Sequence, residues 1–433
     1  MSGPLPASED GAVRWTSPFC LLLCDTLGVR ANASGTALEL AEGECAAARL
    51  ALARFPGMPS VAAPQVDGLS VDPDQALDAA ARILADSRQP LFGGLGTDVA
   101  GARALYRLAT ETGAICDAAR GPALMHTVRT LQDRGGYSTT LAEVRNRADL
   151  LVFLGGLPGG GAAEFMARCG VGEAGSPPRH LVLLGGSPEE QAGLAALTGR
   201  AELTMESLPL QGDLFDTVAL LSALVARRAV PAPPPGLAAL AERLLAAHYA
   251  VLVGQTDAMP AHGNLLIEAA NRIVATLNTA TRAAAMWLGG GNGAGTVNEV
   301  FTWLSGLPLR SRNGPGGVEH DPLCFDTARL LAEGAADSLL WVSCFDPDGI
   351  APGTQVPLIV LGHPDLAASA QRVGSVFLPV STPGIGSPGH LFRADGGTVL
   401  PLVPLYRDTL PTLAEVLGQL LQRVQALRAK AVP

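Results

Sequence analysis

Short, continuous apolar runs alternate along the chain with longer segments whose apolar residues recur every three or four positions. The runs predict strands buried on both faces, as in a parallel sheet covered by helices. They lie at residues 90–92, 149–154, 180–185, 250–253, 338–343, 357–361 and 375–379. The longer segments predict helices at residues 76–87, 100–112, 213–226, 264–277 and 412–428. This alternation predicts a three-layer α/β fold that binds ligands at the carboxyl ends of its strands.

Proline and glycine interrupt this rhythm at two places. Residues 56–73 are rich in Pro, Gly and small polar residues, and Pro231-Ala232-Pro233-Pro234-Pro235-Gly236 is a polyproline stretch. Both are predicted to be linkers. At 433 residues the chain is long enough for about three domains.

The composition narrows the choice of partners. Apolar residues make up 48% of the chain, but no apolar run approaches the roughly 20 residues of a membrane span. The excess apolar surface favours a lasting interface with other subunits. The net charge of −10 and the lack of a Lys/Arg cluster argue against nucleic acid or an anionic membrane as partner. No signal-peptide pattern is visible, and seven scattered cysteines make no disulfide framework, so we expect a cytoplasmic protein.

The glycine-rich loops carry little specific information. Gly93-Gly94-Leu95-Gly96, Gly155-Gly156 and the loop at 289–295 match neither the dinucleotide-binding pattern G-x-G-x-x-G nor a Walker A loop. We interpret them as ordinary turns between strands and helices.

An incomplete iron–sulfur frame lies near the N-terminus. A [4Fe–4S] cluster takes four thiolates, and the spacing C-x2-C-x3-C with a distant fourth Cys is one way to supply them. Here Ser17 stands at the first position, which leaves Cys20, Cys24 and Cys45.

Several segments together resemble the B subunit of formylmethanofuran dehydrogenase, of the molybdopterin (tungsten or molybdenum) oxidoreductase superfamily. The similarity runs in consistent order over about residues 15 to 405. It is carried by Pro18-Phe19-Cys20-Leu21-Leu22-Leu23-Cys24-Asp25, by Asp117-Ala118-Ala119-Arg120-Gly121-Pro122, and by the segments at 136–144, 147–150, 298–303 and 383–389.

The departures from the family pattern concern its cofactors. Ala119 and Arg120 replace the Cys that binds the metal and the neighbouring His, and a methyl group cannot coordinate a metal. Ser17 replaces the first cluster Cys, and Leu21 replaces a Gly that helps the backbone surround the cluster. We therefore expect molybdopterin, tungsten or molybdenum, and the [4Fe–4S] cluster to be lost. The three thiols are expected to pack as small apolar groups without metal, in a buried strand.

The resemblance then narrows to the non-redox B subunit of the formyltransferase/hydrolase complex of methylotrophic bacteria. That complex moves a formyl group from tetrahydromethanopterin to a methanofuran-like carrier and hydrolyses it to formate. The chain is expected to be a non-catalytic scaffold within it, with hydrolase-like, formyltransferase and β-helical subunits as partners.

Two alternatives remain open. One is a redox-active tungsten or molybdenum subunit. The other is a carrier-binding subunit that uses the vacated pterin cleft, lined by Gly94, Arg120, Gly155, Gly290 and Asn292, although collapse of that cleft is the simpler expectation. No catalytic site of its own is expected: Glu319-His320-Asp321 is the densest polar group, and it supplies too few ligands for a metal.

The resemblance also implies a discontinuous organisation. Residues 1–60 would form a small N-terminal segment, and 61–146 would join 236–400 in one α/β domain. Residues 147–235 would be an inserted Rossmann-like domain, and 401–433 a C-terminal helix and tail. The C-terminal domain that caps the cofactor elsewhere in the superfamily is not visible.

Overall fold

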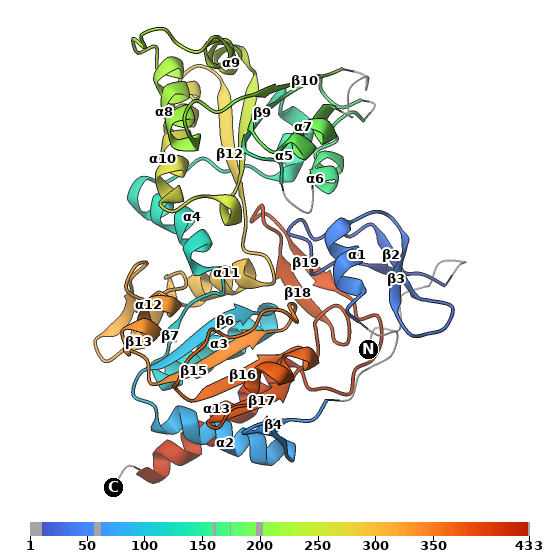
Figure 1. Cartoon of the computed structure of the whole chain (residues 1–433), viewed down its shortest axis with the longest axis vertical. Helices are drawn as coiled ribbons and strands as arrows, with labels where there is room; N and C mark the ends of the chain where they lie inside the picture. Colours follow the sequence, from blue (N-terminus) through green and yellow to red (C-terminus); the bar gives the residue numbers. More distant parts are fainter. Residues whose placement is uncertain (1–10, 56–61, 159–161, 174, 196–201, 432–433) are drawn as a thin grey trace. The chain divides into compact units, whose positions relative to one another are not determined.

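The computed structural model describes residues 11–55, 62–158, 162–173, 175–195 and 202–431 (Figure 1). It divides into two compact units. Unit 1 comprises Met1–Pro122, Gly290–Arg393 and Thr398–Pro433, and unit 2 comprises Ala123–Gly289 and Ala394–Gly397.

A nine-stranded sheet forms the core of unit 1, in the order β14-β13-β7-β6-β15-β16-β17-β4-β5. The strands from β7 to β17 run parallel, while β13 and β4 flank them antiparallel. Every residue of β6, β15, β16 and β17 is buried, which explains their continuous apolar sequences. The bounds are Gly317–His320, Ser311–Gly314, Ile115–Cys116, Pro90–Gly96, Ser338–Ser343, Leu358–Gly362, Ser375–Pro379, Gln65–Val66 and Leu69–Ser70, in the order of the sheet.

Helices α2 (Pro73–Asp86), α3 (Val99–Thr112) and α13 (Leu413–Ala431) pack together in unit 1. In Figure 1, α2 and α13 lie side by side below the sheet. Helix α11 (Ala294–Ser305) packs on α3 and β6, and α12 (Thr327–Ala332) precedes β15. Helix α2 begins sharply because Asp72 and Gln75 form a capping box ahead of Pro73.

The N-terminal part of unit 1 is a three-stranded antiparallel sheet of β1 (Val13–Trp15), β2 (Leu27–Ala31) and β3 (Leu38–Glu42), followed by α1 (Ala46–Leu52). Unit 1 also contains the 3₁₀ helix η2 (Pro364–Ala370) and the hairpin of β18 (Gly389–Phe392) and β19 (Val399–Leu402).

Unit 2 is built on a five-stranded sheet in the order β10-β9-β8-β11-β12, parallel throughout. Alternate residues of β8, such as Val152, join the apolar core beneath α8, α9 and α10. Phe153 points the other way and meets Phe165 of α6 edge-on. In Figure 1, α5 to α7 lie across the sheet from α8 and α10. The strand bounds are Leu203–Leu208, Arg179–Gly185, Leu150–Gly155, Tyr249–Gln255 and Arg282–Leu288, in the order of the sheet.

The helices of unit 2 fill the connections between these strands. They are α4 (Gly121–Arg134, which begins at the end of unit 1), α5 (Leu141–Arg147), α6 (Ala162–Arg168), α7 (Pro188–Ala195), α8 (Leu214–Val225), α9 (Pro235–Ala246), η1 (Thr256–Ala258) and α10 (Gly263–Leu277).

The predicted α/β fold with parallel sheets is confirmed, and the seven strands and five helices predicted from the alternating pattern are present. The other strands, β10 and β12 of unit 2 among them, were not predicted, and neither were the remaining helices. Helix α9 begins inside the predicted linker at 231–236, because Pro235 occupies its first turn, where proline is tolerated. Residues 65–70, within the other predicted linker, form the β4–β5 hairpin, and residues 56–61 lie outside the described ranges.

The domain boundaries differ from the predicted ones. Unit 2 spans Ala123–Gly289 instead of 147–235, because β11 pairs with β8 and β12 pairs with β11. Residues 401–433 are not separate, since α13 packs on α2 and α3 inside unit 1. No helix in the described part of the chain is long and apolar enough to cross a membrane.

Candidate functional site

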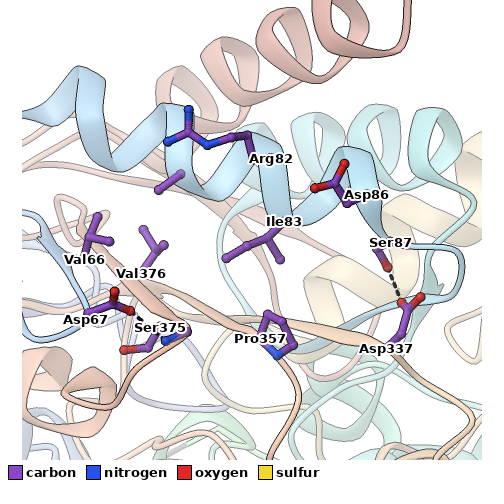
Figure 2. Close-up of a pocket in the computed structure, with 12 residues that line it drawn as sticks. Val66, Asp67, Arg82, Ile83, Asp86, Ser87, Asp337, Pro357, Ser375 and Val376 are labelled. Carbon is purple, nitrogen blue, oxygen red and sulfur yellow. Dashed lines mark hydrogen bonds between the residues drawn. The ribbon is translucent and has the colours of Figure 1, made fainter. Parts of the chain in front are cut away.

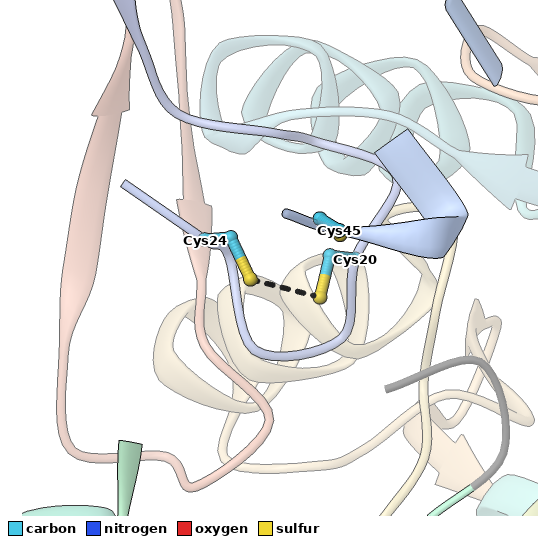
Figure 3. Close-up of side chains that lie close together, drawn as sticks. All are labelled: Cys20, Cys24 and Cys45. Atoms are coloured by element: carbon cyan, nitrogen blue, oxygen red, sulfur yellow. Dashed lines mark hydrogen bonds between the residues drawn. The ribbon is translucent and has the colours of Figure 1, made fainter. Parts of the chain in front are cut away.

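The loop between β1 and β2 brings two of the frame cysteines together (Figure 3). The Ser17 N–H donates to the Cys24 carbonyl at 2.9 Å, and the Leu23 N–H donates to the Cys20 carbonyl at 2.9 Å. These bonds close the loop and place the Cys20 and Cys24 sulfurs 3.5 Å apart. The predicted buried strand at this position is wrong: Leu23 adopts a left-handed φ of 45°, and the segment is a turn.

Cys45 completes the group from a second segment. It is the N-cap residue of α1, and its sulfur accepts a hydrogen bond from the Ala48 N–H at 3.5 Å. The three cysteines are buried, and their sulfurs all lie within 4.8 Å of one another. We call Cys20, Cys24 and Cys45 the three-thiol site.

The three thiols shift one another's pKa values. Hydrogen bonds from Cys24 and Cys45 lower the pKa of Cys20, because S–H donors stabilise a thiolate. The same contacts with Cys20 raise the pKa of Cys24 and Cys45, and burial adds to both shifts.

This arrangement does not fit a [4Fe–4S] cube. A cube takes four thiolates, and this group supplies three. The residue at the fourth position, Ser17, offers a hydroxyl that already accepts a hydrogen bond from the Phe19 N–H at 3.4 Å.

The position of the lost metal ligand looks different. Ala119 and Arg120 are exposed between β7 and α4. Just before them, Asp117 is buried in an ion pair, with the Arg310 Nε 3.0 Å from its Oδ1 and the Thr327 N–H donating to its Oδ2 at 2.9 Å. Burial raises the pKa of Asp117, while the Arg310 charge and both hydrogen bonds lower it. The methyl side chain of Ala119 cannot coordinate a metal, so this position offers no metal ligand.

Three of the predicted cleft residues contact other atoms of unit 1. A Cβ added at Gly94, where φ is +74°, would lie 2.6 Å from the Val342 carbonyl oxygen and 2.9 Å from the Trp341 ring. A Cβ at Gly290 would lie 2.8 Å from the Cα of Gly295. The Asn292 side chain donates to the Asp346 carboxylate at 3.1 Å.

The fourth, Arg120, is exposed, and the fifth, Gly155, lies in unit 2 at the end of β8, where Leu214 packs against it.

Two cavities of about 350 Å³ lie elsewhere in unit 1. One, at the carboxyl ends of β16 and β17, is lined by Arg54, Phe55, Ala62, His363, Pro364, Asp365, Val380, Thr382, Ile385, Tyr406 and Asp408. The other is the groove of Figure 2, where Arg82 and Asp86 of α2 face Asp67 and Asp337. Neither cavity was predicted from the sequence. Because α/β folds bind ligands at the carboxyl ends of their strands, His363, the residue after β16, could have indicated the first one.

The Glu319-His320-Asp321 triplet forms no catalytic group. Glu319 pairs with Arg312 at 2.7 Å, and the His320 Nδ1 lies 2.9 Å from the Arg310 carbonyl oxygen. Asp321 accepts the backbone N–H groups of Leu323 and Cys324. Each side chain stabilises the hairpin or the turn that follows it.

No protein-family model matches the chain. Comparison with individual proteins nevertheless identifies its family. The B subunit of the formyltransferase/hydrolase complex Fhc of Methylorubrum extorquens is 31% identical over 338 residues, which cover 77% of this chain and 89% of that one. The chain belongs to this family of B subunits. The B subunit of tungsten-containing formylmethanofuran dehydrogenase 2 of Methanocaldococcus jannaschii is more distant, at 24% identity over 416 residues, which cover 88% of this chain and 90% of that one.

The fold agrees with the family. A chain in the crystal structure of the formyltransferase/hydrolase complex (FhcABCD) from Methylorubrum extorquens, in complex with methylofuran, matches with a TM-score of 0.71. The two are 29% identical, and the match covers 86% of this chain and all of that one. The predicted resemblance to the B subunits is thereby confirmed.

Proposed function

We propose that this B-family chain is a non-redox, scaffolding subunit of a formyltransferase/hydrolase complex. The observation that carries the non-redox part is Ala119, an exposed methyl group at the position of the metal ligand. The three-thiol site supports it, since Ser17 stands where a cube needs a fourth thiolate. Tungsten or molybdenum, molybdopterin and the [4Fe–4S] cluster are then absent from the working protein.

In this proposal the chemistry belongs to other subunits. The complex would transfer a formyl group from tetrahydromethanopterin to a methanofuran-like carrier and hydrolyse it to formate, in the cytoplasm. The match to a complex solved with methylofuran supports this assignment. The chain's partners would be the hydrolase-like, formyltransferase and β-helical subunits.

Exposed apolar side chains support a role in assembly. Trp303 on α11 is 69% exposed, and Leu50 on α1 is 75% exposed. Aromatic side chains are enriched at protein interfaces, and a large apolar side chain in water costs free energy that a partner recovers. We prefer this role to carrier binding, because Gly94, Gly290 and Asn292 contact the chain's own atoms.

The test is co-expression of the tagged chain with the three other subunits of its source. We expect one complex that contains all four chains, forms formate from formyl-tetrahydromethanopterin, and holds only traces of tungsten, molybdenum and iron. The complex with Arg120→Ala should keep the same turnover and the same apparent affinity for the carrier.

Near-stoichiometric tungsten or molybdenum, or four iron atoms per chain, would contradict the non-redox assignment. A chain that remains alone when the other three subunits assemble would contradict the scaffolding role. Loss of carrier affinity in Arg120→Ala would favour the carrier-binding alternative instead.

A further inference from the structure

We propose that Cys20, Cys24 and Cys45 bind a single zinc ion. Zinc takes thiolate ligands at about 2.3 Å in tetrahedral geometry, which sets neighbouring sulfurs about 3.8 Å apart. The Cys20 and Cys24 sulfurs are 3.5 Å apart, and all three lie within 4.8 Å. The three sulfurs therefore lie close to the spacing that one tetrahedral ion requires.

The site is built from two segments that hold the sulfurs toward one point. Figure 3 shows Cys20 and Cys24 turned toward each other across their loop, with Cys45 beside them at the start of α1. Backbone hydrogen bonds fix the loop through Ser17 and Leu23. An ion here would tie the β1–β2 loop to α1, and so close the N-terminal part of unit 1.

Burial and donor chemistry both favour a soft, thiophilic ion. The three residues are 4%, 5% and 1% exposed, so hard oxygen ligands and bulk water contribute little. Thiolates select zinc and other soft ions over magnesium or calcium. Three thiolates and Zn²⁺ leave a net charge of −1, and in this proposal one water molecule takes the fourth tetrahedral position.

The other cysteines provide a contrast. Cys116, Cys169 and Cys344 are buried and Cys324 is exposed, and none of these joins a group of three possible ligands in the described part of the chain. A zinc ion at this site differs from the expectation from the sequence, which was that the three thiols pack without metal. It also goes beyond the scaffolding role, because a scaffold needs no ion.

The experiment uses the full chain, kept reduced and freed of metal by a chelator. We expect Co²⁺, used as the probe, to bind one ion per chain with an intense thiolate-to-cobalt charge-transfer band. Zn²⁺ should bleach that band at one equivalent. Zn²⁺ should also raise the melting temperature, because an ion that binds the native state stabilises it by mass action.

Variants separate the site from other thiols. Cys20→Ser and Cys45→Ser should each weaken Zn²⁺ binding by about 100-fold or more, since removal of even an outer-shell partner costs up to about that factor. Cys344→Ala, which removes a buried thiol elsewhere in unit 1, should bind as the wild type does. Circular dichroism of each metal-free variant checks that the fold is retained.

Several results would overturn the proposal. They are a reduced wild-type chain that binds no Co²⁺ or Zn²⁺, unchanged affinity in a folded Cys45→Ser variant, or anaerobic reconstitution to four iron and four sulfide per chain. The first two would leave the scaffolding function intact, because assembly of the complex is measured separately. The third would contradict both.

Discussion

The β1–β2 loop and the segment from Asp117 to Arg120 correspond to two places where the formylmethanofuran dehydrogenase pattern has cofactor ligands. The first keeps three sulfurs together in a buried group, although Ser17 replaces one ligand. The second keeps no ligand, and Ala119 and Arg120 face solvent. The loss of one of four ligands leaves three thiols that can still bind a single metal ion, as proposed above. The loss of the ligand at Ala119 leaves no side chain there that can coordinate a metal.

Different forces hold the two segments on unit 1. Aromatic rings anchor the β1–β2 loop and the end of α1: Phe19 packs on Phe55 with ring centroids 5.5 Å apart, and Phe55 meets His363 edge-on at 5.0 Å. A buried ion pair between Asp117 and Arg310 anchors the other segment. Apolar packing tolerates small losses, but a buried pair leaves an uncompensated charge when one partner is removed.

The largest effect is expected from Arg310→Ala. The free energy of unfolding should fall by about 3–5 kcal/mol, because Asp117 then keeps a buried carboxylate without its partner. Urea unfolding of the full chain measures this change. Arg30→Ala breaks the exposed pair with Glu39 and should cost less than about 1 kcal/mol. Equal losses in the two variants would show that the Asp117 segment does not depend on the ion pair.

Ala119→Cys tests the difference in exposure between the two regions. In a Cys324→Ser background, which removes the native exposed thiol, the new thiol should react with a disulfide reagent at least about 100-fold faster than Cys20, Cys24 and Cys45. Buried thiols react only when the structure opens locally. Stopped-flow absorbance follows the reaction, and comparable rates for all four thiols would remove the contrast between the two regions.

The smallest expected effect is the pH dependence of stability that arises from His363, which packs on Phe55. Burial lowers the pKa of His363, with Asp365, Arg54, Asp348 and Asp408 as the other charges around it. An unfolded histidine titrates near pH 6.5, so below that pH the unfolded state takes up a proton that the native state resists. The free energy of unfolding should therefore decrease as the pH falls from about 6.5 toward the native pKa, by at most about 1.4 kcal/mol per pH unit for this group.

Two histidine variants isolate this contribution. His363→Asn keeps an acceptor for the Asp365 N–H and should make stability less dependent on pH. His390→Asn, which removes an exposed imidazole, is the matched control. Urea midpoints at several pH values measure the slopes, and equal slopes in wild type and His363→Asn would contradict the assignment.

The sequence was a good guide to local structure and a poor one to the division into units. Buried strands such as β8 and β15 are continuous apolar runs, and helices such as α3 carry a clear period, so both were predicted. Strand β12 was missed because its sequence, Arg-Ala-Ala-Ala-Met-Trp-Leu, is typical of a helix as much as of a strand. That strand and β11 determine where unit 2 ends.

The candidate site was predicted in part. The cysteine spacing and Ala119 were visible as departures from a family pattern, and that pattern was enough to assign the family. The roles of Gly94 and Asn292 could not be predicted, because their contacts with Trp341 and Asp346 join residues far apart in the chain. The same is true of Asp117, whose partner Arg310 lies in a different segment of unit 1.

By itself, then, the sequence determined the α/β class, seven strands and five helices of the two units, the family, and the loss of the metal ligand at Ala119. These features follow from the periodicity of the sequence and from the identity of single residues. Both can be recognised without knowledge of tertiary contacts. The tertiary structure decided that β11 and β12 belong to unit 2, and that Cys20, Cys24 and Cys45 converge within 4.8 Å. Such facts depend on strand pairing and on loop closure, which bring distant residues together and leave no mark on local sequence.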